Sequence, residues 1–221
     1  MISAVIPIRK GSQRVKKKNL RKFNKKNLLI YKIEKLKKLK NLDEIIVNTD
    51  SEEAIRIAKK YEVSFVKRSP YFASSRCTNS EFWSHIAQHT NNKFIMFTNC
   101  TSPLIKIKTY QNIIDRFLKK KNLIKSINTV TSIKEYLYYK NKPVNFNPSK
   151  APNSQNLGNT FKLNFAVNII SQKEMFKRKT VVSTKPFFYF LNELEGFDID
   201  TKIDFKIAEF LHKQKKIWKK Y

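Results

Sequence analysis

The stretch SAVIPIRKGSQRVKKKN, residues 3–19, joins a short apolar run to a loop crowded with lysine and arginine. The run from Ser3 to Ile8 has the length of a buried strand and shows no helical period. Gly11, one of only three glycines in the chain, follows it where a tight turn would bring backbone N–H groups near an anion. Ligands of open α/β sheets bind beyond the carboxyl ends of the strands. The loop is therefore either a phosphate-binding loop or a basic, solvated one.

Short apolar runs alternate with helical patterns over the first 130 residues. This alternation predicts right-handed crossovers and an α/β fold with a Rossmann-like, doubly wound and mostly parallel sheet. We expect strands at 3–8, 44–49, 64–67, 93–99 and 124–130, and helices at 28–39, 51–60, 80–89 and 108–120. Asp50 is expected to be the N-cap of the helix at 51–60.

The alternation lapses between residues 131 and 161, which are rich in Tyr, Asn and Pro. We expect this segment to leave the main sheet as an excursion, with a hairpin as one possible form, inside a single domain spanning 1–221. Strands are expected to resume at 162–170 and 187–192. The closing helix from Lys202 is expected to place its apolar side chains on one side: Ile203, Ile207, Phe210, Leu211 and Ile217.

The chain carries 46 Lys and Arg against 17 Asp and Glu, a formal net charge of +29. Such a field attracts any polyanion, but the lysines occur in nearly every segment, as on ordinary solvated faces. No RRM, KH, zinc-finger or helix-turn-helix signature is present, so we expect no specific nucleic-acid partner. A nucleic-acid-binding protein remains the alternative that the charge would favour.

Other signals favour a cytoplasmic protein without a membrane partner. We expect no signal peptide, since none is visible in the apolar run at residues 2–8, and no apolar stretch approaches the roughly 20 residues that span a bilayer. Cys77 and Cys100 lack the spacing of metal ligands, which favours reduced thiols. The pair His85 and His89 lies in HIAQH, which lacks the Glu of a zincin helix.

Two carboxylates near the C-terminus form the second candidate site. In GFDIDTKIDF, residues 196–205, Asp198 and Asp200 alternate with Ile199 and so leave an extended segment on the same face. Mg²⁺ is commonly held by one or two carboxylates together with substrate phosphates. The pair therefore predicts a Mg²⁺ site, against the alternative of a helix cap and a surface acid. Asp204 is expected to cap the last helix.

Seven blocks of the sequence resemble, in order, those of the acylneuraminate and ketodeoxyoctulosonate cytidylyltransferases. IPIRKGSQRVKKKNL is similar to that family's opening Ile-Pro-Ala-Arg-x-Gly-Ser-Lys-Arg signature, and FDIDTKIDFKIAE nearly repeats its closing IDIDTEEDFEIAE. The blocks between them are VNTDSEEAIRIAKKY, KRSPYFA, CTSPL, SQNLG and NFAVNI. Together they cover almost the whole chain.

The resemblance implies an enzyme that transfers CMP from CTP to the anomeric hydroxyl of an acidic sugar and releases pyrophosphate. It also implies a homodimer in which 131–161 contributes to dimerisation or to the acceptor pocket. Arg9, Gly11, Ser12, Arg14 and Lys18 would hold the triphosphate, Arg9 and Lys18 acting in catalysis with Asp198 and Asp200, the Mg²⁺ ligands. Asn19 and Arg68 would lie near ribose and cytosine, and Thr78 and Asn79 in the segment that closes on the base. Asn99, Gln155 and Asn164 are the candidate acceptor ligands.

The acceptor pocket departs from the family pattern. Asn99 stands for a Gln, Ile105 for an Arg, Phe165 for a Gly, and Ser154 for the Arg that usually meets the sugar carboxylate. Ser cannot reproduce the bidentate contact of Arg with a carboxylate. The acceptor is therefore left open among nonulosonates, octulosonates and other acids. A catalytically degenerate paralogue that binds a nucleotide without transferring it is the alternative.

Overall fold

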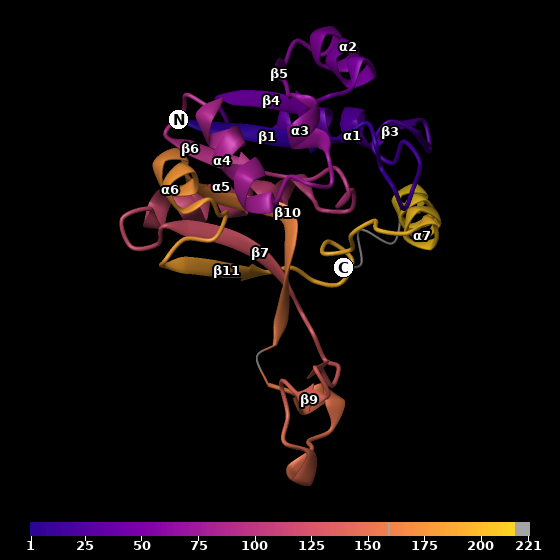
Figure 1. Ribbon diagram of the computed structural model, residues 1–221, viewed down its shortest axis with the longest axis vertical. Coiled ribbons are helices and arrows are strands. Elements are labelled where there is room, and N and C mark those ends of the chain that lie inside the picture. Colours follow the sequence, from indigo (N-terminus) through magenta and orange to yellow (C-terminus); the bar gives the residue numbers. More distant parts are fainter. Residues whose placement is uncertain (159, 215–221) are drawn as a thin grey trace.

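The computed structural model describes residues 1–158 and 160–214, and their main element is a seven-stranded sheet (Figure 1). The strands lie in the order β11-β7-β10-β6-β1-β4-β5. β10 runs antiparallel to its neighbours β6 and β7, whereas the other paired strands are parallel. Their bounds are β1 (Ile2–Ile8), β4 (Glu44–Thr49), β5 (Ser64–Lys67), β6 (Phe94–Phe97), β7 (Ser126–Ser132), β10 (Phe161–Ser171) and β11 (Pro186–Phe190). The predicted α/β fold with a mostly parallel sheet is confirmed.

Helices pack on both faces of this sheet. One core takes side chains from α1, α2, α5 and α7, and a second core takes them from α4 and α6. Within β1, Ala4, Ile6 and Ile8 enter the first core and Val5 enters the second. Burial on both faces explains why this strand is apolar along its length. The helices are α1 (Leu28–Leu36), α2 (Glu52–Lys60), α3 (Pro70–Ala73), α4 (Asn79–Gln88), α5 (Ile107–Lys120), α6 (Gln172–Arg178) and α7 (Lys202–Lys213).

The predicted cap of α2 is wrong by one residue. Ser51 is the N-cap, and its side chain accepts a hydrogen bond from the backbone N–H of Ala54. The Asp50 carboxylate instead accepts one from the backbone N–H of Lys10, at 2.9 Å. Asp50 thus ties the loop after β1 to the end of β4, a long-range contact that local cap preferences do not reveal.

The apolar side predicted for α7 is not the side that the helix buries. Phe205 and Ala208 are the buried residues of this helix, whereas Ile203 and Phe210 are 69% and 60% exposed and Ile207 is exposed as well. The buried face meets the small hairpin of β2 (Lys22–Phe23) and β3 (Lys26–Asn27), where Phe205 contacts Phe23 edge to face. Glu209 accepts a hydrogen bond from the backbone N–H of Asn24 in the same hairpin, which sets the rotation of the helix. Ile217 lies outside the described residues.

Residues following β7 project away from the sheet before the chain returns along β10 (Figure 1). This projection contains a two-stranded hairpin, β8 (Tyr138–Tyr139) and β9 (Lys142–Pro143), and two 3-10 turns, Pro148–Lys150 and Ser154–Asn156. Rings of Tyr136 and Tyr138 pack edge to face against Phe146. The predicted excursion is therefore present, while its role in dimerisation stays a prediction.

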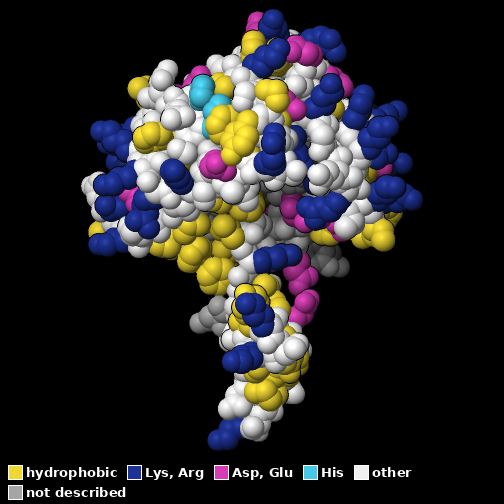
Figure 2. Space-filling model, viewed as in Figure 1, with side chains coloured by type: hydrophobic (Ala, Val, Ile, Leu, Met, Phe, Trp, Pro, Cys, Tyr) yellow, Lys and Arg dark blue, Asp and Glu magenta, His cyan; other side chains and the backbone are white. Residues whose placement is uncertain are grey.

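Surface charge follows the composition. Figure 2 shows Lys and Arg side chains scattered over the visible face of the body and along the projection, without a single continuous stripe. Among residues 1–158 and 160–214, no helix is long and apolar enough to span a bilayer.

A buried histidine on α4, His85, makes stability depend on pH. The His85 ring stacks on Phe72 at a centroid distance of 3.9 Å, and its Nε2 has no hydrogen-bond partner within the described residues. Burial lowers the pKa of His85 to about 4, with the charges of His89 and Arg68 adding to the shift. An imidazole with a depressed pKa binds a proton more readily in the unfolded chain, so its contribution to stability falls as pH drops from about 6.5 towards 4.

We therefore expect the free energy of unfolding of His85→Phe to rise relative to that of the wild type as the pH falls from about 6.5 to 4. Above pH 7 the difference in free energy of unfolding between the two proteins should stay constant. Urea unfolding at several pH values between 4 and 8 measures the difference. A difference that does not change with pH would contradict the assignment of a neutral, buried imidazole.

Candidate functional site

A large cleft opens at the carboxyl ends of the parallel strands, with a volume of about 1420 Å³. Its lining comes from the loop after β1, the start of α4, the ends of β6 and β7, the first half of β10 and the segment before α7. Ligand pockets for single drug-sized molecules occupy about 300–1,000 Å³. The cleft is thus large enough for a nucleotide and a second substrate together.

The loop after β1 contributes most of its predicted residues to this cleft. Arg9, Ser12, Arg14, Lys18 and Asn19 all line it. Gly11 does not line it, its φ is not positive, and an added Cβ would meet nothing within 4 Å. The chain does turn tightly at Gly11, where the Ser12 N–H donates to Lys10 O at 3.2 Å, but this turn does not require glycine and Gly11 itself stays outside the lining.

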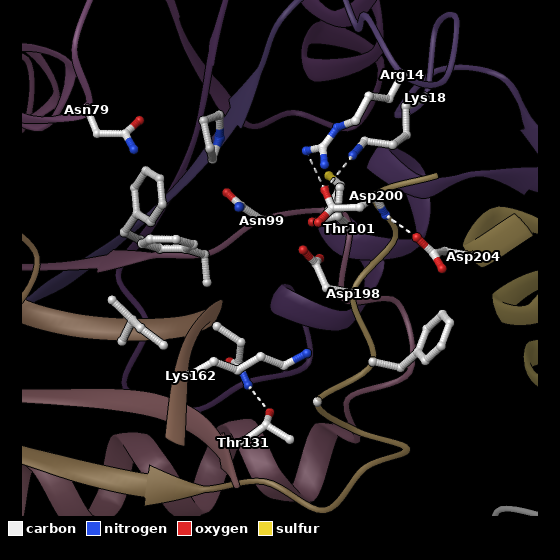
Figure 3. Close-up of a pocket in the computed structure, with 18 of the residues that line it drawn as sticks. Arg14, Lys18, Asn79, Asn99, Thr101, Thr131, Lys162, Asp198, Asp200 and Asp204 are labelled. Atoms are coloured by element: carbon white, nitrogen blue, oxygen red, sulfur yellow. Dashed lines mark hydrogen bonds and ion pairs between the residues drawn. The ribbon is translucent and has the colours of Figure 1, made fainter. Parts of the chain in front are cut away.

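Contacts across 181–186 residues of sequence join this loop to the segment of the two aspartates. Arg14 donates a hydrogen bond to Asp200 Oδ1 at 2.6 Å, and Lys18 Nζ donates to the backbone carbonyl of Ile199 at 2.6 Å. Lys18 Nζ also lies 3.9 Å from Asp200 Oδ1. In Figure 3, Arg14 and Lys18 point at Asp200 from one side of the cleft, with Asp198 beyond it.

Burial sets the electrostatics of Lys18. It lowers the pKa of this side chain below its ordinary value, and the carboxylates of Asp198 and Asp200 oppose the shift. The neighbouring Arg14 charge acts in the same direction as burial. An ammonium that is partly desolvated beside a second cation interacts strongly with any incoming anion.

Asp198 and Asp200 both line the cleft, as expected from their alternation with Ile199, which is fully buried. Ser102 Oγ donates to Asp198 Oδ1 at 3.4 Å. Asp204 forms the predicted cap, since its side chain and that of Thr201 make a capping box at the start of α7. Among the residues that the structure describes, no group of three or more His, Cys, Asp or Glu could hold a metal alone. Two carboxylates suit a cation such as Mg²⁺ that takes its other ligands from phosphates and water.

Arg68 lines the cleft, but its guanidinium is occupied by backbone carbonyls. It donates hydrogen bonds to Ile8 O, to Asn48 O at 3.0 Å and to Phe72 O at 3.3 Å. Burial lowers the pKa of Arg68 to about 10, while Asp50 opposes the shift. Arg68 therefore joins the ends of β1 and β4 to α3 beneath one wall of the cleft.

Thr78 and Asn79 differ in their placement. The Thr78 hydroxyl caps α4 through a capping box with Glu81, and Thr78 is not among the lining residues. Asn79 lines the cleft and lies far across it from Asp198 and Asp200, with Asn99 between (Figure 3).

Of the three candidate acceptor ligands, two line the cleft and one does not. Asn99 lines the cleft, and its backbone N–H donates to Phe165 O at 2.9 Å. Asn164 also lines it, but its Nδ2 donates to Thr131 Oγ1 at 2.8 Å. Gln155 lies in the projection, outside the lining, so the structure does not bring it to the cleft.

Several lining residues were missed by the sequence reasoning. Lys162 extends from β10 into the cleft below Asp198 (Figure 3). Among the described residues, no hydrogen bond or ion pair engages its ammonium group. Gly196 lies so close to Thr131 that an added Cβ would be 2.5 Å from Oγ1. A lysine inside an otherwise apolar strand pattern was the available signal for Lys162.

The sequence profile described as cytidylyltransferase matches residues 3–220. The chain belongs to the cytidylyltransferase family. It is therefore a nucleotidyltransferase that uses CTP, and the predicted family and enzyme class are confirmed.

Individual relatives agree with this family. This chain is 26% identical over 233 residues to the post-translational flagellin modification protein B of Campylobacter coli. The alignment covers 98% of this chain and 97% of that protein. It is 25% identical over 224 residues to the CMP-N,N'-diacetyllegionaminic acid synthase of Campylobacter jejuni, covering 95% and 94%. Its fold is similar to that of a CMP-2-keto-3-deoxy-manno-octonic acid synthetase complexed with CTP, with a TM-score of 0.72, 11% identity and coverage of 97% and 99%.

The hydrogen bonds from Arg68 to three backbone carbonyls predict that this residue stabilises the fold of the cytidylyltransferase. Arg68→Ala would leave the buried carbonyls of Ile8 and Asn48 without their donor, so we expect the free energy of unfolding to fall by about 2–3 kcal/mol. Urea denaturation measures this loss, and Arg76→Ala, which removes an exposed arginine, is the matched control. A loss no larger than that of the control would contradict the role.

Proposed function

We propose that this cytidylyltransferase transfers CMP from CTP to the anomeric hydroxyl of an acidic sugar. The observation that carries the proposal is the contact of Arg14 and Lys18 with the segment of Asp198 and Asp200 across one cleft. A triphosphate and its cation need clustered basic and acidic groups at the same place. Names of relatives that make CMP-activated acidic sugars support the choice of acceptor class.

The reaction balances as one displacement at phosphorus. The sugar oxygen forms a bond to the α-phosphorus of CTP, the bond from that phosphorus to the bridging oxygen of pyrophosphate breaks, and the hydroxyl proton of the sugar passes to water. Such a reaction needs in-line positioning and neutralisation of charge more than covalent catalysis by the protein.

Each part of the cleft has a role in this proposal. Arg9, Ser12, Arg14 and Lys18 bind and orient the triphosphate, with Lys18 supplying charge where pyrophosphate leaves. Asp198 and Asp200 would hold Mg²⁺, which when bound polarises the α-phosphate as a Lewis acid. Asn79 and the wall supported by Arg68 border the space for ribose and cytosine, and Asn99 borders the acceptor.

The carboxylate of the acceptor would meet Lys162. Ser154, which stands where the family usually has an arginine for this contact, lies outside the cleft lining. Lys162 reaches the cleft from β10 with an ammonium group that no neighbour among the described residues engages. A lysine provides a point charge in place of the bidentate arginine contact.

The projection is proposed to contribute to a homodimer. Tyr138, Tyr139 and Val144 on its hairpin are 62%, 67% and 59% exposed. Exposed apolar and aromatic side chains gathered along a projecting hairpin suit contact with a second copy of the chain.

The proposal predicts pyrophosphate release from CTP when an acidic nonulosonate or octulosonate and Mg²⁺ are present. Asp198→Asn and Asp200→Asn should lower kcat at least 10³-fold, because each removes a charge that holds the cation, while the melting temperature stays within a few degrees. Asp115→Asn, on the exposed side of α5, is the matched control and should keep full turnover.

Failure of every acceptor, with CTP still raising the melting temperature, would instead favour the nucleotide-binding paralogue without transfer. A fully active Asp200→Asn enzyme would contradict the metal assignment.

A second prediction concerns the acceptor charge. Lys162→Gln should raise the KM for the acidic sugar at least tenfold and leave the KM for CTP within about twofold. Lys134→Gln is the matched control, since Lys134 lines the same cleft but its ammonium already donates to Leu157 O at 3.0 Å. Equal effects of Lys162→Gln on both KM values would contradict a contact confined to the acceptor.

A further inference from the structure

One wall of the cleft is apolar and aromatic. It comprises Phe82 and Trp83 from α4, Phe97 from β6, and Leu163 and Phe165 from β10, all of which line the cleft. Phe165 packs edge to face on Phe97 at 6.0 Å and lies tilted to Trp83 at 6.2 Å. We refer to these five side chains as the aromatic wall.

The aromatic wall is backed by the second core. Phe97 is buried, and Phe82, Trp83, Leu163 and Phe165 are partly buried and pack against that core. Side chains held in this way keep their positions, so the wall presents a preformed apolar surface rather than a mobile one. A ligand group that contacts it must leave water, and apart from the indole N–H of Trp83 the five side chains offer it no hydrogen-bond partner.

Phe82 and Phe165 mark the two ends of the aromatic wall, Phe82 the end assigned to the nucleotide and Phe165 the end assigned to the acceptor. Phe82 lies beneath the Arg68 guanidinium, 4.6 Å from its ring centroid, at the end assigned to the base. Phe165 lies at the other end, since its carbonyl accepts the backbone N–H of Asn99 and it follows Lys162 by three residues on β10. Trp83 is in contact with Phe165.

Phe165 is also a departure from the family pattern, whose NGAIYI block has glycine where this chain has NFAVNI. A glycine leaves that part of the wall open, whereas a phenylalanine fills it with a ring that faces the cleft. The extra ring changes which acceptor substituents can be accommodated.

We infer that Phe165, together with Trp83 and Leu163, selects acidic sugars that carry a methyl-bearing substituent, either N-acyl or deoxy, over fully hydroxylated ones. This inference rests on the proposed function of the cleft. A methyl group gains from leaving water against the wall. A hydroxyl placed against the carbon atoms of Phe165 and Leu163 loses hydrogen bonds to water without replacement.

The test compares kcat/KM for two acceptors that differ at one substituent: an N-acetylated nonulosonate and its counterpart with a hydroxyl in place of the acetamido group. The wild type should prefer the N-acetylated sugar at least tenfold, the range expected for small apolar differences in a pocket. Phe165→Ala should reduce this preference to within about threefold through the acceptor KM, and Phe165→Leu should retain most of it. The KM for CTP should stay within twofold in both variants.

Phe176→Ala, which removes an exposed phenylalanine from α6, is the matched control and should keep the wild-type preference. Equal use of both sugars by the wild type, or an unchanged preference in Phe165→Ala, would overturn the inference while leaving the proposed function intact. A larger effect of Phe165→Ala on CTP than on the sugar would overturn it too, because the ring would then serve the base. If the wild type used neither sugar nor any other acid, the proposed function would fail and the role of the wall with it.

Discussion

The cleft depends on one long-range attachment, in which the loop after β1 binds the Asp198–Asp200 segment. Lys18 reaches the carbonyl of Ile199, and Arg14 pairs with Asp200, each at 2.6 Å. Ile199 is fully buried and donates its N–H to Thr101 O at 2.9 Å, so the segment is anchored in the core between its two half-buried carboxylates. Because the loop is basic and the segment carries two carboxylates, this attachment brings basic and acidic groups to the same edge of the sheet. That edge is where a parallel sheet binds ligands.

The net charge of +29 does not describe the cleft, where acidic and basic side chains occur together. Basic side chains are spread over the body and projection, whereas five of the 17 acidic residues line the cleft: Glu135, Glu193, Asp198, Asp200 and Asp204. A nucleic-acid-binding surface would need a continuous basic stripe, and the visible face offers none. The cleft instead combines both signs of charge, which suits a small anion bound together with a cation. The charge excess therefore says less about function than the placement of a few acids.

Much of this arrangement was predictable from sequence. The alternation of apolar runs and helical patterns gave the parallel sheet, and the spacing of Asp198 and Asp200 placed both carboxylates on one side of Ile199. Tertiary contacts decided the rest. Asp50 binds Lys10 rather than capping α2, and the hairpin at Asn24 turns α7 so that Phe205 rather than Ile203 is buried. Lys162 and Phe165 both line the cleft although adjacent strand positions alternate in direction, since the register of β10 shifts between Leu163 and Asn168. The rotation of a helix about its axis and the position of a bulge in a strand both depend on tertiary contacts, so neither could be predicted from the order of apolar and polar residues.

The central claim is that the cleft directs a sugar oxygen to the α-phosphorus of CTP. Phosphorus NMR of a reaction containing CTP, Mg²⁺ and an acidic sugar follows that atom directly. The account predicts that the three CTP resonances decline together while one phosphodiester signal and one pyrophosphate signal rise, the pyrophosphate signal with twice the area because it contains two equivalent phosphorus atoms. Formation of CDP and inorganic phosphate, or of free CMP without a phosphodiester, would contradict it, because the attack would then occur at another phosphorus or by water.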